Sequence, residues 1–143
     1  MESTPNNSQF PQKAQAARDD EPRRVLIVED EALIAMYVED VISKFGYSVV
    51  GVVSNLEEAL AFIESNTLDA VVLDINLRGK LVFPLADTLM RRGIPFIFAS
   101  SYGERGVPAR YRVGPIVQKP FTASELRRAL AETEQFRQRT AAI

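Results

Sequence analysis

The chain has 143 residues and a net charge of −2, with 46% hydrophobic and 25% charged residues, the balance of an ordinary globular domain. It contains no cysteine and no histidine, which excludes disulfides, thiolate or histidine metal sites, and histidine-based acid–base catalysis. The net charge indicates no basic surface for binding nucleic acid, and no apolar run is long enough to span a membrane. We therefore expect a cytoplasmic protein that binds neither nucleic acid nor a membrane.

The beginning of the chain differs in composition from the rest. Residues 1–22 are rich in Ser, Asn, Gln, Pro and charge. They predict a disordered tail, because they offer too little apolar surface to offset the entropy lost on ordering. We expect one folded domain over residues 23–138 and a frayed end over residues 139–143.

From residue 23 onward, strand-like and helix-like segments alternate. Apolar, mostly β-branched runs predict strands buried on both faces, at Val25–Val28, Tyr47–Val53, Ala70–Leu73, Pro95–Ala99 and around Ile116–Val117. Apolar residues at helical spacing predict the intervening helices, at Glu31–Phe45, from Asn55 onward, at Val82–Arg92 and from Thr122 onward. Thr122 and Glu125 have the spacing of a capping box, which marks the start of the last helix.

The alternation indicates an α/β fold with a parallel sheet covered on both faces. At this size the natural arrangement is a flavodoxin-like (βα)5 doubly wound sheet with strand order 2-1-3-4-5. The crossover between Ser100 and Ile116 is unusual, because glycines and prolines interrupt it repeatedly. We therefore expect the fourth helix to be short or irregular.

Polar residues follow four of the expected strands. They are Glu29 and Asp30 after the first, Asp74 and Asn76 after the third, Ser100 and Ser101 after the fourth, and Lys119 and Pro120 after the fifth. Carboxyl ends of parallel strands meet at one edge of a sheet, and neighbouring strands are about 4.8 Å apart. We expect Asp30, Asp74, Ser100 and Lys119 to converge on one pocket.

The chemistry of this set points to phosphate. Carboxylates in one pocket repel each other and favour a cation among them, and hard oxygen ligands favour Mg²⁺ (or Mn²⁺). A hydroxyl and an ammonium group nearby suit a phosphoryl group, so the set is equipped for phosphoryl transfer to a carboxylate. Taken singly, each residue has a structural explanation: Asp30 as a helix cap, Asp74 in a turn, Ser100 as a loop hydroxyl and Lys119 as a solvated charge.

The segments VLIVEDE, VVLDINL, FIFASSYG and QKPF resemble the four signatures of response-regulator receiver domains, over about residues 23–135. The resemblance implies that Asp74 is the phosphoacceptor. It implies that Glu29 and Asp30 form the acidic pair that binds the metal ion together with Asp74, with the backbone carbonyl of Asn76 as a further ligand.

The fourth and fifth strand ends also have counterparts in that family. Ser100 matches the Thr or Ser that contacts the phosphoryl group, Lys119 matches the lysine that pairs with it, and Pro120 follows in a cis peptide in many members. One departure is Ile116, which stands where the family usually has a rotating Tyr or Phe switch. The usual aromatic flip coupled to Ser100 therefore cannot operate.

The segment from Phe98 to Gly103 resembles the "FAT GUY" receiver subgroup, with Ser100 in place of Thr and Ser101 in place of Gly. That subgroup also lacks the aromatic switch and has an irregular fourth helix. In the family, Asn76 and Tyr102 flank the path of the attacking water, so the resemblance implies that they tune the phosphate lifetime.

The resemblance implies a stand-alone response regulator that accepts a phosphoryl group from a histidine kinase or phosphotransfer protein. Its output would be a contact with a downstream protein, or service as a phosphate sink. Such a receiver phosphorylates and dephosphorylates itself and is not a conventional enzyme. We expect the segment Ser101–Gly114 to be poorly held and to become ordered on phosphorylation.

Three other functions are compatible with a strand-end aspartate. A phosphatase of the haloacid-dehalogenase type needs a second Asp two residues on, where Asn76 stands. A pseudo-receiver that only binds proteins would normally have a degraded acidic pocket, whereas the acidic residues are intact here. A flavin-binding module needs a phosphate-cradling loop after the first strand, where this chain has two acids that would repel phosphate. Leu33, Met36 and Tyr37 on the first helix are either a surface for a partner or a dimer, or part of the core.

Overall fold

The computed structural model describes residues 21–142, so most of the expected tail lies outside the described residues. Its centre is a five-stranded parallel sheet with the order β2-β1-β3-β6-β7. The strands are β1 (Arg24–Val28), β2 (Ser48–Val53), β3 (Ala70–Asp74), β6 (Phe96–Ser100) and β7 (Ile116–Gln118). Counted along the chain, this is the predicted order 2-1-3-4-5, and the flavodoxin-like fold is confirmed.

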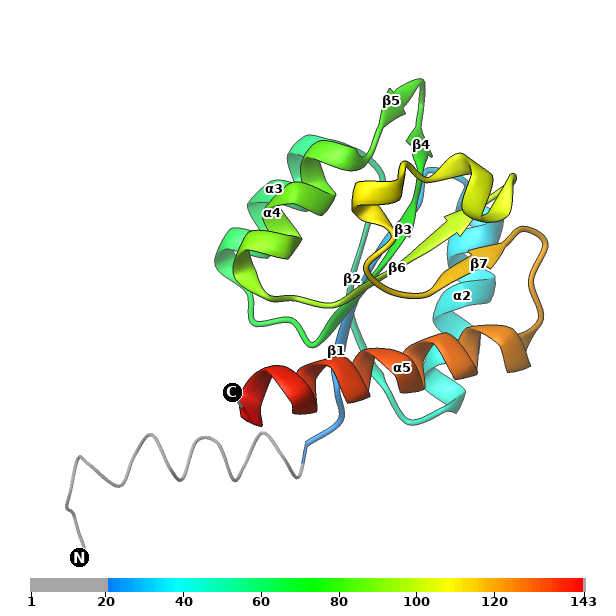
Figure 1. Cartoon of the computed structure of the whole chain (residues 1–143). Coiled ribbons are helices and arrows are strands. Elements are labelled where there is room, and N and C mark those ends of the chain that lie inside the picture. Colours follow the sequence, from blue (N-terminus) through cyan, green and yellow to red (C-terminus); the bar gives the residue numbers. More distant parts are fainter. Residues whose placement is uncertain (1–20, 143) are drawn as a thin grey trace, which may run out of the picture.

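Helices cover both faces of the sheet (Figure 1). They are α2 (Ala32–Lys44), α3 (Leu56–Ser65), α4 (Phe83–Arg92) and α5 (Ala123–Ala142). Because side chains alternate across a strand, Val25 and Ile27 face α2 and α5, while Leu26 and Val28 face α3 and α4. The two resulting cores, one on each side, hold the sheet in place and fix where its strand ends lie.

The last helix begins as the sequence predicts. The Thr122 hydroxyl accepts a hydrogen bond from the Glu125 N–H (3.1 Å), and the Glu125 carboxylate accepts one from the Thr122 N–H (2.8 Å). This is a capping box, which satisfies two backbone donors of the first turn. The helix continues to Ala142, past the residue where fraying is expected; the division into tail, domain and end stays a prediction.

The crossover between β6 and β7 contains two short 3₁₀ turns in place of a regular helix, as predicted. They are η1 (Gly103–Gly106) and η2 (Ala109–Tyr111). The segment is nevertheless anchored, because Val107 and Tyr111 are buried and the Tyr111 ring stacks on Phe83 with 4.8 Å between centroids. Val107 and Tyr111 thus anchor the segment to the core although it lacks a regular helix, and its ordering on phosphorylation stays a prediction.

A small antiparallel hairpin follows β3 and was not expected from the sequence. It consists of β4 (Asn76–Leu77) and β5 (Lys80–Leu81), with Arg78 and Gly79 at its tip. Arg78 has a φ of 53°, in the left-handed region that few residues other than glycine adopt. The hairpin rises beyond the carboxyl edge of the sheet (Figure 1). It therefore adds a wall beside the strand ends. Among residues 21–142, no helix has the length and apolar character needed to cross a membrane.

Candidate functional site

Three carboxylates meet at the carboxyl edge of the sheet. Glu29 and Asp30 follow β1 and Asp74 ends β3, and β1 and β3 are adjacent parallel strands. One oxygen from each carboxylate lies within 4.8 Å of the others. Glu29 is buried, and the other two are partly exposed. Such a set of hard oxygen atoms can hold a divalent cation, with room for water or phosphate oxygens on the exposed side.

Lys119 brings a positive charge to this cluster from the end of β7. Its Nζ lies 3.1 Å from Glu29 Oε1 and 3.2 Å from Asp74 Oδ1, and its side chain is largely buried. The peptide between Lys119 and Pro120 is cis, as the family resemblance implies. Of the four side chains predicted to converge, Asp30, Asp74 and Lys119 lie together in this cluster, whereas the Ser100 hydroxyl bonds to the Tyr102 N–H instead.

The pKa values of the buried pair reflect their surroundings. Burial raises the pKa of Glu29 to about 7, and the charge of Asp74 adds to the rise, against the hydrogen bonds from Glu31 and Lys119. Burial alone would lower the pKa of Lys119, but the hydrogen bond with Glu29 and the charge of Asp74 outweigh it and raise this pKa above 10.5. Lys119 therefore stays charged. Its single positive charge does not balance the three carboxylates, so the cluster can bind a further cation.

Backbone amides orient two of the carboxylates. The Glu31 N–H donates to Glu29 Oε2 (3.0 Å), and the Arg78 N–H donates to Asp30 Oδ2 (2.9 Å). The second bond crosses from the unexpected hairpin, whose tip is held by a bond from the Gly79 N–H to Asn76 Oδ1 (2.7 Å). Sequence reasoning missed Arg78, because a backbone donor carries no side-chain signature; Asn76 and Gly79 signalled only a turn.

Ser100 lies at the end of β6 and is buried. Its hydroxyl accepts a hydrogen bond from the Tyr102 N–H (3.0 Å) and faces the η1 turn. Tyr102 itself is 70% exposed, and Ser101 is also exposed, so both stand at the rim of the site. Ile116, at the position of the usual aromatic switch, is half-buried against the core.

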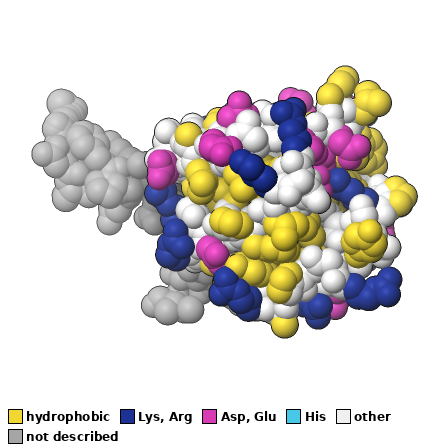
Figure 2. Space-filling model, turned by 90° about the horizontal axis from the view of Figure 1, so that it is seen from above, with side chains coloured by type: hydrophobic (Ala, Val, Ile, Leu, Met, Phe, Trp, Pro, Cys, Tyr) yellow, Lys and Arg dark blue, Asp and Glu magenta, His cyan; other side chains and the backbone are white. Residues whose placement is uncertain are grey.

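An apolar hollow of about 490 Å³ lies beside Lys119. It is lined by Glu31, Leu33, Ile34, Tyr37, Ser101, Lys119, Pro120 and Phe121. Figure 2 looks onto this end of the molecule and shows hydrophobic side chains gathered between charged ones. Leu33 is 81% exposed, and Met36 and Tyr37 are exposed too, so these three residues are surface and not core.

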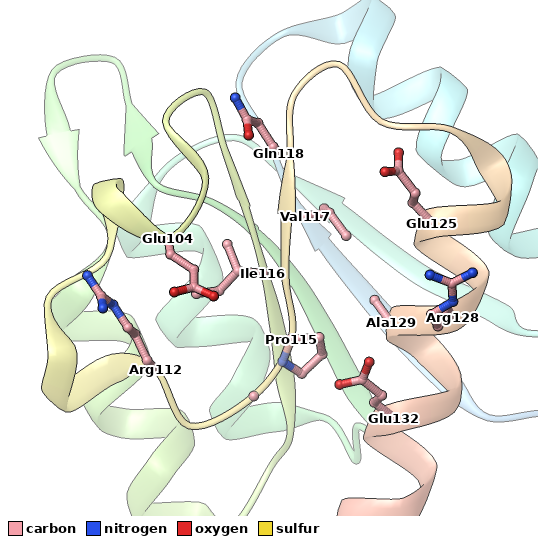
Figure 3. Close-up of a pocket in the computed structure, with 11 residues that line it drawn as sticks. Glu104, Arg112, Pro115, Ile116, Val117, Gln118, Glu125, Arg128, Ala129 and Glu132 are labelled. Atoms are coloured by element: carbon pink, nitrogen blue, oxygen red, sulfur yellow. The ribbon is translucent and has the colours of Figure 1, made fainter.

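A second hollow, of about 540 Å³, lies along β7 and contains none of the acidic cluster. Figure 3 shows Glu104 and Arg112 from the η1–η2 segment on one side and Glu125, Arg128 and Glu132 from α5 on the other. Its floor is β7, which is one of the two edge strands of the parallel sheet. The η1–η2 segment thus forms one wall of this hollow, and α5 forms the other.

Known proteins share this fold and sequence. The sequence model of the family "Response regulator receiver domain" matches residues 25–131 of this chain. The transcriptional regulatory protein PdtaR of Mycobacterium tuberculosis is 32% identical over 125 residues, 84% of this chain and 61% of PdtaR. The solution structure of SdrG from Sphingomonas melonis Fr1 is similar with a TM-score of 0.71 and 42% identity, over 78% of this chain and 96% of SdrG. The solution structure of the BeF3-activated conformation of SdrG from Pseudomonas melonis Fr1 is similar with a TM-score of 0.67 and 40% identity, over 79% of this chain and 97% of that one.

A parallel sheet of this order, with carboxylates and a lysine at its carboxyl edge, defines the receiver class of two-component proteins. The chain belongs to the response regulator receiver domain family. Receiver domains are phosphorylated on an aspartate, generally bind Mg²⁺, and interact with kinases or phosphotransfer proteins. The chain spans 61% of the length of PdtaR and 44% of the phyllosphere-induced regulator PhyR of Methylorubrum extorquens, which is 30% identical over 80% of this chain.

Proposed function

We propose that this chain is a response-regulator receiver domain in which Asp74 accepts a phosphoryl group from a histidine kinase or phosphotransfer protein. The observation that carries the proposal is the position of the Asp74 carboxylate, within 4.8 Å of two further acids and 3.2 Å from the Lys119 ammonium group. A partly exposed nucleophile, a site for a cation and a fixed positive charge are what phosphoryl transfer to a carboxylate requires.

The metal fits the residues present. Glu29, Asp30 and Asp74, with the backbone carbonyl of Asn76, would hold Mg²⁺ (or Mn²⁺), because the donor set consists of hard oxygen atoms. The ion would neutralise the charge that gathers on the phosphoryl oxygens. The bond from the Arg78 N–H to Asp30 keeps that carboxylate turned toward the cluster.

The chain's own groups then carry the transfer. An oxygen of Asp74 forms a bond to phosphorus, and the bond between phosphorus and the histidine nitrogen of the donor breaks, leaving its electron pair on that nitrogen. Lys119 stays paired with Asp74 and compensates the added charge. The Ser100 hydroxyl donates a hydrogen bond to a phosphoryl oxygen. Water later cleaves the acyl phosphate, and Tyr102, Ser101, Asn76 and Pro120 at the rim modulate its access.

The donor protein would dock on the apolar hollow beside Lys119. Its exposed lining residues Leu33 and Tyr37 belong to α2, and Pro120 and Phe121 follow Lys119 directly. A histidine-bearing helix seated there would bury apolar surface while its phosphoryl group faces the carboxylates. The output would be a protein contact or a phosphate sink, in a receiver of the "FAT GUY" subgroup.

Intact-mass measurement tests the phosphoacceptor. With Mg²⁺ and a small phosphodonor such as acetyl phosphate, the wild type should gain one phosphoryl group and Asp74→Asn should gain none. Asp87→Asn is the matched control, since Asp87 lies in α4 and pairs with Arg110 outside the cluster. Unlabelled wild type would favour the pseudo-receiver alternative, and labelled Asp74→Asn would refute the assignment of Asp74.

A further inference from the structure

We propose that Gly106 is a positioning residue for the Ser100 hydroxyl and couples it to the η1 turn, in a chain that has Ile116 in place of an aromatic switch. The inference rests on the proposed phosphorylation of Asp74. It concerns a contact between two residues that the sequence places six positions apart, in different elements. A side chain that obstructs the resting position of the hydroxyl should favour the position it takes beside a phosphoryl group.

The Ser100 hydroxyl occupies the space that a side chain at position 106 would need. A Cβ atom added at Gly106 would lie only 2.5 Å from Ser100 Oγ, while its next neighbours, Tyr102 Cβ and Ser100 Cβ, would be 3.5 and 3.7 Å away. Those two distances are ordinary van der Waals contacts, so the conflict involves the hydroxyl oxygen alone. Gly106 has no left-handed φ, unlike Gly103, so the backbone itself would accept alanine. Glycine is needed at 106 for space.

The hydroxyl is held on the η1 side of the site. Ser100 is 2% exposed, and its Oγ accepts the Tyr102 N–H at 3.0 Å. Within residues 21–142, no hydrogen bond joins the Ser100 side chain to Asp74 or Lys119, whose ammonium group is occupied by Glu29 and Asp74. A phosphoryl group on Asp74 must therefore draw the hydroxyl away from Gly106 to accept a hydrogen bond from it.

Gly106 connects this movement to the rest of the crossover. It ends η1, and the next residue, Val107, is buried and donates its N–H to the backbone carbonyl of Glu104 (3.0 Å). The Arg112 side chain donates to the Val107 carbonyl (2.7 Å). Glu104 and Arg112 form one wall of the hollow along β7 (Figure 3). A hydroxyl that leaves Gly106 frees space under η1, and a shift of η1 into this space reshapes that wall.

Beryllofluoride with Mg²⁺ serves as the phosphoryl mimic for the test. A methyl group at 106 disfavours the resting position of the hydroxyl, so by population shift Gly106→Ala should bind beryllofluoride about fivefold or more tightly than wild type. In the Ser100→Ala background the same substitution should change the affinity little, because no oxygen remains to be displaced. Gly114→Ala is the control: its Cβ would contact Phe96 O (3.2 Å) and has no contact with Ser100.

Unchanged or weaker binding by Gly106→Ala, or an equal gain in the Ser100→Ala background, would overturn the inference. The free energy of unfolding gives a second readout that does not need phosphorylation. Gly106→Ala should destabilise the protein, and Ser100→Ala should rescue most of that loss; additive effects would also overturn the inference. If the wild type fails to bind beryllofluoride, the proposed function fails while this double-mutant cycle still decides the role of Gly106.

Discussion

The Glu29 carboxylate is buried beside Asp74 and shares one ammonium group with it. Burial is the main cause of the raised pKa of Glu29, about 7, and the charge of Asp74 adds to it, because two negative charges face a single positive charge. A proton satisfies Glu29 at low pH, and a divalent cation would do so at neutral pH. Metal binding and proton release are therefore coupled at this residue.

A dependence of stability on pH follows for the metal-free protein. The folded state keeps the Glu29 proton up to about pH 7, whereas the unfolded chain releases it near its ordinary pKa of 4.5. The unfolded state thus binds fewer protons between these values, and this contribution to stability is lost as the pH rises. Urea unfolding from pH 5 to 8 should show wild type losing stability relative to Glu29→Gln. Parallel curves would contradict the raised pKa, and saturating Mg²⁺ should flatten the difference.

Single residues of the site differ in how visible they are in the sequence. Asp74, Asp30 and Lys119 were predicted because each ends or follows an apolar run, and a parallel sheet brings such ends together. Arg78 and Gly106 were not, since one acts through its backbone N–H and the other through the lack of a side chain. Contacts of that kind are fixed by tertiary packing and leave no pattern of residue types.

At the scale of elements, the β6–β7 crossover combines broken helix geometry with firm anchoring. Glycines and prolines remove the regular helix, but Tyr111 lies between the Phe83 ring (4.8 Å between centroids) and the Arg110 guanidinium group (4.4 Å from its centroid). Arg110 also pairs with Asp87 of α4. The breakers were readable in the sequence, whereas the anchors Val107 and Tyr111 were not, because two apolar residues in so short a segment show no helix or strand periodicity.

Removing this anchor should loosen the crossover. Tyr111→Ala deletes a buried aromatic ring and should lower the free energy of unfolding by about 3 kcal/mol. Hydrogen exchange should quicken over residues 101–114 and stay unchanged in α2. Tyr102→Ala is the matched control, since Tyr102 is 70% exposed and its loss should cost within about 0.5 kcal/mol. Equal effects of the two substitutions would show that the stacking on Phe83 does not hold the segment.

Across the whole molecule, the residues that stabilise the fold and the residues of the candidate site lie in different places on the parallel sheet. The buried apolar side chains lie on the two faces of the sheet, under the helices, and the carboxylates and Lys119 lie at its carboxyl edge. The topology was predictable because alternating strands and helices permit few arrangements. The hairpin β4–β5 was not, since two-residue strands carry too little pattern.

This separation leaves the end of α2 free to bind a partner beside the carboxylates. Leu33→Ala should slow transfer from a histidine-phosphorylated kinase or phosphotransfer protein about tenfold, through weaker docking, because about 1.4 kcal/mol of apolar contact corresponds to that factor. Labelling by acetyl phosphate should be unchanged, since Leu33 is 81% exposed and supports no core contact. Met90→Ala is the control, an exposed apolar residue in α4 on the other face of the sheet. Equal slowing by both variants, or loss of acetyl phosphate labelling in Leu33→Ala, would contradict a docking surface on α2.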